Sequence, residues 1–478
     1  MMSDCGFEHR GKFLGLIEEG THLSNGGKTG LDYLKELGVT HLQLMPIGDF
    51  GTVDEDHPEA YYNWGYDPIQ YSVPEGSYAT DARNPYARVL ELKQMIAKLH
   101  ECGFRVIMDV VYNHMFDRYK TAFEKIVPSY YFRHGKNGEL SNGSFCGNDM
   151  ATDKIMMRKY IVESCLRWVE EYGVDGFRFD LMGIIDIETM NQVVEACRKV
   201  DENLMFYGEG WNMPTILPDE MKSMIDNHQK LPYIAFFNDH FRNIMRGPNG
   251  AEHMFEKGYT SGNTYLTHDA ALAVLGCDYL TDPWRSLNYI ECHDNETFWD
   301  KLKVSNYQDT RALLYTRMNI SNAMVLLSLG VPFLHSGQEF CRTKFGEHNT
   351  YNRPDSINQI NWYRKQHNIE QVNFVKDMIK IRKMFPCFRI AEAKVVEQCC
   401  KVEEIDYRML VITYDYEMDG YDQVKVFFNP SEKAYPISLG EGTFELVGDL
   451  RGYVGEILDQ KEVIMLPISL MIVARKRQ

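Results

Sequence analysis

The sequence predicts an α/β protein, a (β/α)8 TIM barrel with inserted loops that is followed by an antiparallel β-sandwich domain. Helical and extended patterns alternate from about residue 12 to residue 385, and repeated helix–glycine–strand units build a parallel sheet. Acidic residues close several short apolar runs, as expected where parallel strands end at the mouth of a barrel. After residue 386 the pattern changes to short apolar runs separated by Gly, Pro and Asp. We therefore expect two domains, 1–385 and 386–478.

The first barrel elements are expected close to the N-terminus. The apolar run at residues 12–17 predicts a first strand. Thr29 can cap a helix whose leucines stand at positions 31, 34 and 37 and which ends at Gly38. An apolar strand at 39–45 follows.

Two longer helices have clear apolar faces. Apolar residues of the first recur at helical spacing, at Val89, Leu92, Ile96 and Leu99. This helix ends at Gly103 and leads into a strand at 104–111. The apolar face of the second is formed by Ile161, Cys165, Trp168, Val169 and Tyr172. It ends at Gly173, before the strand that carries Asp180.

Two long insertions rich in Gly and Asn interrupt the alternation, at 46–87 and 115–150. Long ordered loops at a barrel mouth are usually functional. In the C-terminal part, strands are predicted at 409–414, 423–429, 443–447 and 462–473.

Composition excludes several classes of partner. The chain has 478 residues and a net charge of −17, which repels nucleic acid and anionic membranes. Its 11 cysteines are odd in number and scattered, so reduced thiols in a cytoplasmic protein are the simplest account. The N-terminus has no apolar signal core, and the longest apolar stretch, at 322–334, is too short to span a bilayer. No obligate protein partner is evident.

Three carboxylates at expected strand ends are the candidate catalytic groups: Asp180, Glu209 and Asp294. Like charges that meet in one cleft raise each other's pKa, which is costly. Chemistry that needs one ionised and one protonated carboxyl group explains that cost, and glycoside hydrolysis is the leading case.

Neighbouring residues support this interpretation. Arg178 points to the same side of its strand as Asp180 and can hold that carboxylate ionised. Glu209 stands beside Trp211, an apolar neighbour that can raise its pKa toward that of a general acid. Asp109, His114 and His293 also stand at strand ends or just beyond them. Any one of these residues alone is more often structural, whereas the joint pattern favours a catalytic site.

The same segments carry a family resemblance. Four of them resemble the signature regions of the α-amylase superfamily (glycoside hydrolase family thirteen): DVVYNH at 109–114, GFRFD at 176–180, YGEGW at 207–211 and CHDN at 292–295. The segment YNWGYDP at 62–68 resembles the hallmark of type I pullulanases, which cut α-1,6 branch points. The similarity runs from about residue 11 to the C-terminus.

The resemblance implies an anomer-retaining double displacement on an α-glucan. Asp180 would be the nucleophile, Glu209 the acid/base, and Asp294 would favour the distorted transition state. A retaining enzyme has about 5–5.5 Å between the two reacting carboxyl groups. Substrate contacts are expected from Tyr66, Asp109, His114, Arg178, Trp211, His293 and Asn295.

Cofactor use and linkage are less tightly determined. Asn113 resembles a calcium-binding asparagine of the superfamily, but a structural asparagine is about as well supported, so no metal and no other cofactor is expected. Alternatives to a debranching hydrolase are an isoamylase-like or α-amylase-like hydrolase, a glucosyltransferase of the same superfamily, and a non-catalytic glucan-binding protein. A non-catalytic glucan-binding protein is disfavoured, because a protein that only binds has no need for three carboxylates whose mutual repulsion is costly.

Overall fold

The computed structural model describes residues 5–276 and 280–477, which divide into two compact units. The first unit contains 5–35, Val39–Phe237 and Tyr351–Ser356. The second contains Glu36–Gly38, Asn238–Thr350 and 357–477, apart from 277–279. A division of the chain into domains 1–385 and 386–478 stays a prediction.

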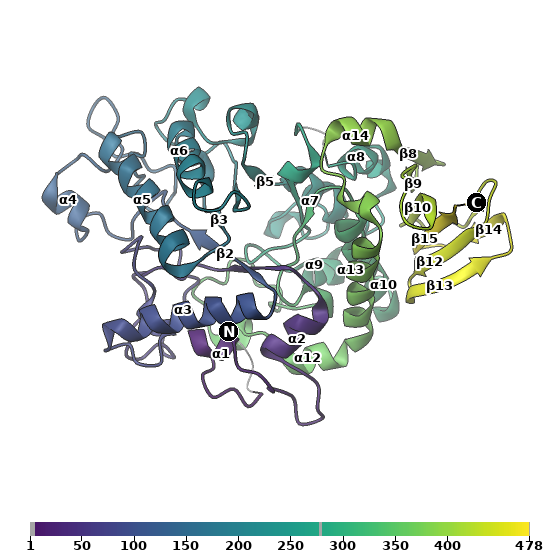
Figure 1. The fold of residues 1–478 in the computed structure, drawn as a ribbon, viewed down its shortest axis with the longest axis horizontal. Coiled ribbons are helices and arrows are strands. Elements are labelled where there is room, and N and C mark those ends of the chain that lie inside the picture. The colour runs from purple at the N-terminus through teal and green to yellow at the C-terminus, as the bar shows by residue number, and fades with distance from the viewer. Residues whose placement is uncertain (1–4, 277–279, 478) are drawn as a thin grey trace. The chain divides into compact units, whose positions relative to one another are not determined.

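Parallel strands form the centre of the first unit. They pair in the order of the sequence: β1 (His41–Leu44), β2 (Arg105–Val110), β3 (Gly176–Phe179), β4 (Met205–Gly208) and β5 (Ala235–Phe237). The helices of this unit are α1 (Phe13–Leu16), α2 (Gly30–Leu37), α3 (Pro85–Glu101), α4 (Ala122–Ile126), α5 (Ile155–Tyr172) and α6 (Ile187–Arg198). Helices α5 and α6 lie side by side (Figure 1).

The two long amphipathic helices are confirmed. Helix α3 buries Leu92, Ile96 and Leu99, and Asn84 caps it by accepting a hydrogen bond from the Tyr86 N–H group. Helix α5 buries the apolar face that the sequence predicted, from Ile161 to Tyr172. It ends at a glycine in the left-handed conformation, Gly173, with φ 73°.

The predicted strand at residues 12–17 is wrong, because the chain forms the short helix α1 there. Local hydrogen bonds turn the backbone: Lys12 N–H donates to His9 O, and Gly15 N–H to Lys12 O. A Cβ atom on Gly15 would lie 2.0 Å from His9 O, so the turn requires glycine. Phe13 is buried, and its ring centroid lies 5.6 Å from that of Tyr78. A short apolar run cannot by itself distinguish a strand from a helical turn.

The second unit contains two further parallel strands, β6 (Ser286–Asn288) and β7 (Val331–Pro332). Its helices are α7 (Asp239–Arg246), α8 (Thr267–Ala273), α9 (Phe298–Ser305), α10 (Arg311–Leu327), α12 (Trp362–His367), α13 (Ile369–Met384) and α14 (Ala393–Cys399), and α11 (Asp355–Asn358) has residues in both units. Helices α10 and α13 pack together (Figure 1). Strand β6 ends at Asn288, so Asp294 lies on the loop after the strand and not at its last residue.

Antiparallel sheets form the last part of the chain, as predicted. A six-stranded sheet has the order β13-β12-β15-β10-β9-β8, and β11 pairs with β14. The strands are β8 (Cys400–Ile405), β9 (Met409–Tyr414), β10 (Tyr421–Asn429), β11 (Tyr435–Ser438), β12 (Phe444–Asp449), β13 (Gly452–Leu458), β14 (Glu462–Met465) and β15 (Ser469–Lys476). Both sheets contribute to one buried cluster that includes Phe427, Ile437 and Met465. The strand predicted at 462–473 is divided around Pro467, because proline cannot donate to a strand ladder.

No helix among the described residues is long and apolar enough to cross a membrane.

Gly173 should be required for stability at the end of α5. Replacing it by Ala forces a side chain into the left-handed region, and the nearest atom to the added Cβ, His100 Cε1, is 3.8 Å away. The cost is therefore conformational, and we expect Gly173→Ala to lower the free energy of unfolding by about 1–2 kcal/mol. Gly173→Asn should cost less, because Asn tolerates this conformation. Urea unfolding measures both variants, and equal losses would contradict this explanation.

Candidate active site

One buried arginine joins three predicted site residues in the first unit. Arg178 lies on β3 and exposes 2% of its surface. Its Nη1 atom donates to Asp109 Oδ1 at 2.9 Å and to Asp180 Oδ1 at 3.0 Å. Its Nη2 atom donates to Glu209 Oε1. The structure thus brings Asp109, Asp180 and Glu209 together at the ends of β2, β3 and β4.

Strand register produces this convergence. Asp109 pairs with Arg178 between β2 and β3, and Arg178 pairs with Tyr207 between β3 and β4. Asp180 and Glu209 each follow directly after the last residue of their strand. Gly208 permits this close packing, because a Cβ atom there would lie 2.6 Å from Phe179 O.

The Asp180 carboxylate is also held by a residue of the loop that follows β2. Asn113 Nδ2 donates to Asp180 Oδ2 and to Asp180 O, both at 2.8 Å. Asn113 Oδ1 lies 2.5 Å from His114 Nδ1. Because a carbonyl oxygen can only accept, His114 carries its proton on Nδ1. Asn113 is therefore engaged by protein groups through both ends of its amide.

His114 is buried and neutral. Burial lowers its pKa, although the Asp180 charge favours the protonated ring. The Tyr66 backbone also forms a hydrogen bond with the ring, which favours its protonated form.

A hydrogen bond between Asp109 and Tyr66 extends the network around Arg178. The Tyr66 hydroxyl donates to Asp109 Oδ2 at 2.7 Å, and burial, with the Asp109 charge, raises the Tyr66 pKa so that the proton stays on the phenol. Burial raises the pKa of Asp109 to about 7, while Arg178 favours its ionised form. The Arg178 guanidinium carbon lies 5.5 Å from the Tyr66 ring centroid, within cation–π range.

Trp64 supports the loop that carries Tyr66. It exposes 6% of its surface, and its ring meets the Tyr66 ring edge-on, with centroids 6.5 Å apart. Its backbone N–H group donates to Tyr351 O at 3.1 Å. Trp64 is thus a packing residue, whereas Tyr66 is only half-buried.

Glu209 accepts hydrogen bonds from its surroundings, whereas the sequence suggested that an apolar neighbour would raise its pKa. Besides Arg178, the Leu181 N–H group donates to Glu209 Oε2 at 2.9 Å. Leu181 has φ 39°, an uncommon value for a non-glycine residue. Trp211 is half-buried, and its carbonyl oxygen would lie 1.8 Å from a Cβ atom on Gly183, so Gly183 has to be glycine.

The remaining predicted site residues belong to the second unit. His293 Nε2 lies 3.6 Å from Asp294 Oδ1. Asn295 has φ 56°, and its N–H group donates to Asn349 Oδ1 at 2.9 Å. Asn is one of the few residues besides glycine that adopt this left-handed conformation readily.

Lys344 holds this segment and was not found from the sequence. Its Nζ atom donates to His293 O at 2.8 Å and to Asn295 O. Burial lowers the pKa of Lys344 to about 8. No sequence signal marks it, because Lys344 and Asn295 are far apart along the chain and meet only in the fold.

Comparison with known proteins agrees with the geometry. Residues 24–144 match the model of the alpha amylase catalytic domain. The pullulanase of Bacillus subtilis (strain 168) is 42% identical over 434 residues, which are 88% of this chain and 59% of that protein. The crystal structure of pullulanase from Anoxybacillus sp. LM18-11 complexed with maltotetraose is 41% identical and has a TM-score of 0.94, covering 99% of this chain and 69% of that one.

The chain belongs to the pullulanase family. Type I pullulanase from Bacillus subtilis str. 168, solved with maltose, has a TM-score of 0.96 at 38% identity and covers 99% of this chain and 68% of that one. These similarities confirm the predicted fold class, a barrel of α/β type followed by antiparallel sheets. This pullulanase-family chain spans 59% of the Bacillus subtilis protein and 37% of pullulanase A of Streptococcus pneumoniae, to which it is 30% identical.

Asn113 should stabilise the network measurably. Asn113→Ala removes the partner of Asp180 Oδ2 and of His114 Nδ1 in a buried site, and we expect it to lower the free energy of unfolding by about 1–3 kcal/mol. Asn137→Ala is the matched control, since Asn137 is exposed on the 115–150 insertion. Urea unfolding compares the two variants. A loss at Asn113 no larger than at Asn137 would show that these hydrogen bonds contribute little.

Proposed function

We propose that the chain hydrolyses α-1,6-glucosidic branch linkages in pullulan, branched dextrins, glycogen or amylopectin-derived glucans. The observation that carries the proposal is the buried network in which Arg178 binds Asp109, Asp180 and Glu209, within a chain of the pullulanase family. Related pullulanase crystals contain maltotetraose, maltotriose or maltose, which supports an α-glucan as substrate.

In the first step, Asp180 attacks the anomeric carbon of the sugar on the non-leaving side. As the C–O bond to the leaving sugar breaks, Glu209 gives its proton to the departing oxygen, and a glycosyl ester on Asp180 results. Arg178 and Asn113 hold the Asp180 carboxylate, so little reorganisation is needed at the moment of attack.

In the second step, Glu209, now ionised, removes a proton from water, which attacks the same carbon and releases Asp180. Two inversions give net retention. Asp180 and Glu209 bind neighbouring nitrogens of one guanidinium group, which supports the short separation that a retaining mechanism needs.

The other predicted residues bind substrate in this proposal. Tyr66 presents its ring to the apolar face of the sugar that is cut, and Asp109 fixes the Tyr66 hydroxyl. His114 binds a hydroxyl group of the same sugar. Asp294, His293 and Asn295 bind further hydroxyl groups, and Asp294 favours the oxocarbenium-like geometry. Trp211 contributes to a neighbouring subsite.

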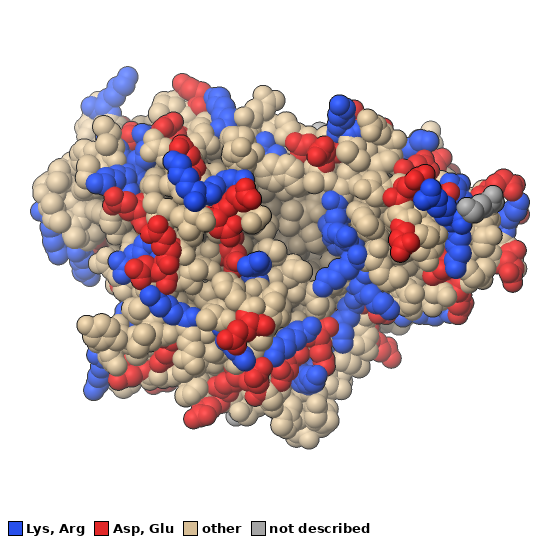
Figure 2. All heavy atoms as spheres, in the orientation of Figure 1, with Lys and Arg blue, Asp and Glu red and all other residues tan. Residues whose placement is uncertain are grey.

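A cytoplasmic location and a neutral substrate also belong to the proposal. Ten described cysteines are free thiols, which suits a reducing compartment. Acidic and basic side chains both lie on the visible face (Figure 2). No cofactor is required for the steps above, because both proton transfers and the nucleophile come from carboxyl groups.

Product analysis on pullulan tests the linkage. We expect maltotriose as the product, because cleavage of every α-1,6 bond in this polymer leaves that trisaccharide, while linear amylose should persist. Chromatography of the digest identifies the products, and Asp180→Asn serves as the blank. Panose or isopanose, or rapid shortening of amylose, would mean α-1,4 cleavage, and longer oligosaccharides would indicate glucosyl transfer.

The kinetics of two variants test Asp180 as the nucleophile and Glu209 as the acid/base. Asp180→Asn should abolish turnover but leave glucan binding largely intact. Glu209→Gln should lower kcat/KM by about 10²–10⁴-fold on natural glucans but far less on an activated aryl glycoside, which needs little protonation. Glu220→Gln, an exposed glutamate of the same unit, should have no effect on either substrate. Equal losses on both substrates would exclude Glu209 as the acid.

A further inference from the structure

Three aromatic residues in the described part of the chain have a left-handed backbone conformation. They are Phe145 with φ 60°, Phe345 with φ 58° and Tyr407 with φ 53°. A bulky side chain rarely adopts this conformation, because its Cβ atom then crowds the backbone. The same residues are exposed, by 74%, 70% and 81% of their surface respectively. Burial of the ring therefore does not compensate the cost of the conformation at any of them.

The hairpin turn between β8 and β9 accounts for Tyr407. Asp406 and Tyr407 are consecutive left-handed residues, with φ 51° and 53°. The turn is closed by the Arg408 N–H group, which donates to Ile405 O at 3.0 Å. Tight hairpin turns of this kind require positive φ at both central residues. The conformation of Tyr407 thus follows from the pairing of its two strands.

Phe145 lies on a loop of the first unit that is fixed by its own hydrogen bonds. The Asp149 carboxylate accepts hydrogen bonds from the Gly143 and Ser144 N–H groups, both at 2.8 Å. The Phe145 N–H group donates to Asn142 O at 3.2 Å. The exposed ring of Phe145 therefore stands on a defined backbone.

This loop is attached to the residues around the candidate nucleophile. Met150 N–H donates to Asn113 O at 2.8 Å, and Asn113 in turn binds Asp180. Cys146 follows Phe145 directly, and burial, then the charge of Asp180, raises the pKa of its thiol to about 11. Phe145 is thus close to Asp180.

Phe345 has a similar position in the second unit. It follows Lys344, whose amine binds the carbonyl groups on either side of Asp294. The N–H groups of Lys344 and Gly346 donate to Asp300 Oδ2 at 2.8 and 3.2 Å, which fixes the turn around Phe345. The second exposed phenylalanine therefore also stands on a fixed turn beside a predicted catalytic carboxylate.

We propose that Phe145 and Phe345 each bind the apolar face of a glucose ring of the α-glucan, beyond the ring that is cut. This inference rests on the proposed function. Aromatic rings offer a large flat apolar surface, and an exposed ring gains free energy when a sugar covers it and removes it from water. Because both backbones are fixed before binding, little conformational entropy is lost when the sugar docks. The uncommon φ values are then explained by the positions in which they hold the two rings.

Pullulan binding to the full chain that carries Asp180→Asn tests the proposal, because this background does not turn the polymer over. Phe145→Gly and Phe345→Gly should each weaken pullulan binding about 3–10-fold in affinity electrophoresis, since each removes one stacking surface. The same variants should raise the melting temperature without pullulan, because glycine adopts the left-handed conformation at no steric cost. Phe145→Tyr and Phe345→Tyr keep a ring and should retain most of the binding.

Tyr407→Gly is the matched control. It replaces an aromatic residue of similar exposure and φ, on a hairpin turn that the proposal does not involve. We expect it to raise the melting temperature as well and to leave pullulan binding unchanged.

Several results would overturn the proposal. One is pullulan binding that both glycine variants leave unchanged, and another is an equal loss in Tyr407→Gly. A tyrosine variant that binds as weakly as its glycine counterpart would show that the ring is not the binding surface, and a loss at one phenylalanine alone would reject the other. Binding is read without turnover, so its outcome is independent of which linkage the unchanged protein cuts.

Discussion

The candidate site of the first unit depends on a single buried guanidinium group. Arg178 contacts Asp109, Asp180 and Glu209. Burying any of these carboxylates at the end of a strand without a counter-charge would cost much free energy. Breaking a buried pair by removing one partner leaves an uncompensated charge and is strongly destabilising. The pairing of β2 with β3 and of β3 with β4 must therefore hold its register, since a shift of one residue would turn Arg178 away from the acids.

The two inserted loops add further residues around the site that the strand ends form. Tyr66 comes from the first insertion and binds Asp109 through its hydroxyl group. The second insertion is closed by Asn148, whose amide exchanges hydrogen bonds with the backbone of Met115 at 3.0 and 2.8 Å. Next to it, burial works against the charge on Asp149, but hydrogen bonds from Ser141, Ser144 and Gly143 lower its pKa. Hydrogen-bonded carboxylates thus hold both loops in defined positions.

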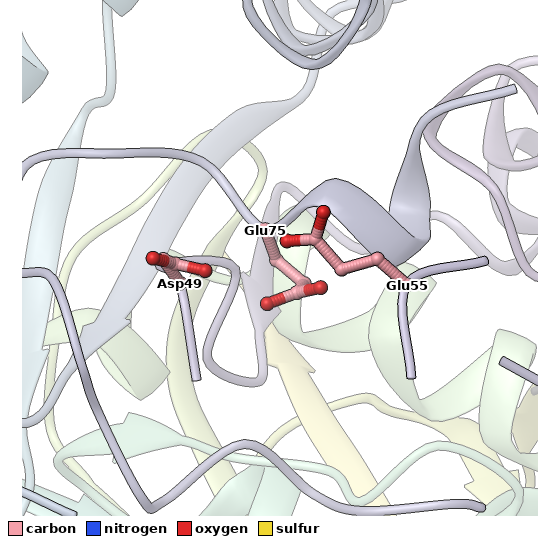
Figure 3. Close-up of side chains that lie close together, drawn as sticks. All are labelled: Asp49, Glu55 and Glu75. Atoms are coloured by element: carbon pink, nitrogen blue, oxygen red, sulfur yellow. The ribbon is translucent and has the colours of Figure 1, made fainter. Parts of the chain in front are cut away.

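The two acidic clusters of the first unit differ in how their charge is balanced. Around Arg178, the guanidinium group contacts all three acids, and Tyr66 and Asn113 supply further hydrogen bonds. The second cluster consists of Asp49, Glu55 and Glu75, whose carboxyl groups lie close together (Figure 3), and Arg88 pairs there with Glu55, one of the three. Burial differs as well, because Glu55 is partly exposed, whereas Asp109, Asp180 and Glu209 are all buried.

The sequence by itself determined the elements that depend on local periodicity, and it supplied the candidate site residues. Helices α3 and α5, the left-handed Gly173 and the positions of Asp180 and Glu209 after their strands all follow from spacing of apolar residues and glycine. The predicted strand at residues 12–17 is wrong because a short apolar run fits both a strand and a helical turn. Local hydrogen bonds, Gly15 and the packing of Phe13 against Tyr78 select the turn. Tertiary structure alone decided that Asn113 binds Asp180, that Lys344 holds Asn295 and that Asp49 meets Glu75. Strand register and loop closure bring these side chains together. Neither is encoded in the local sequence around each residue.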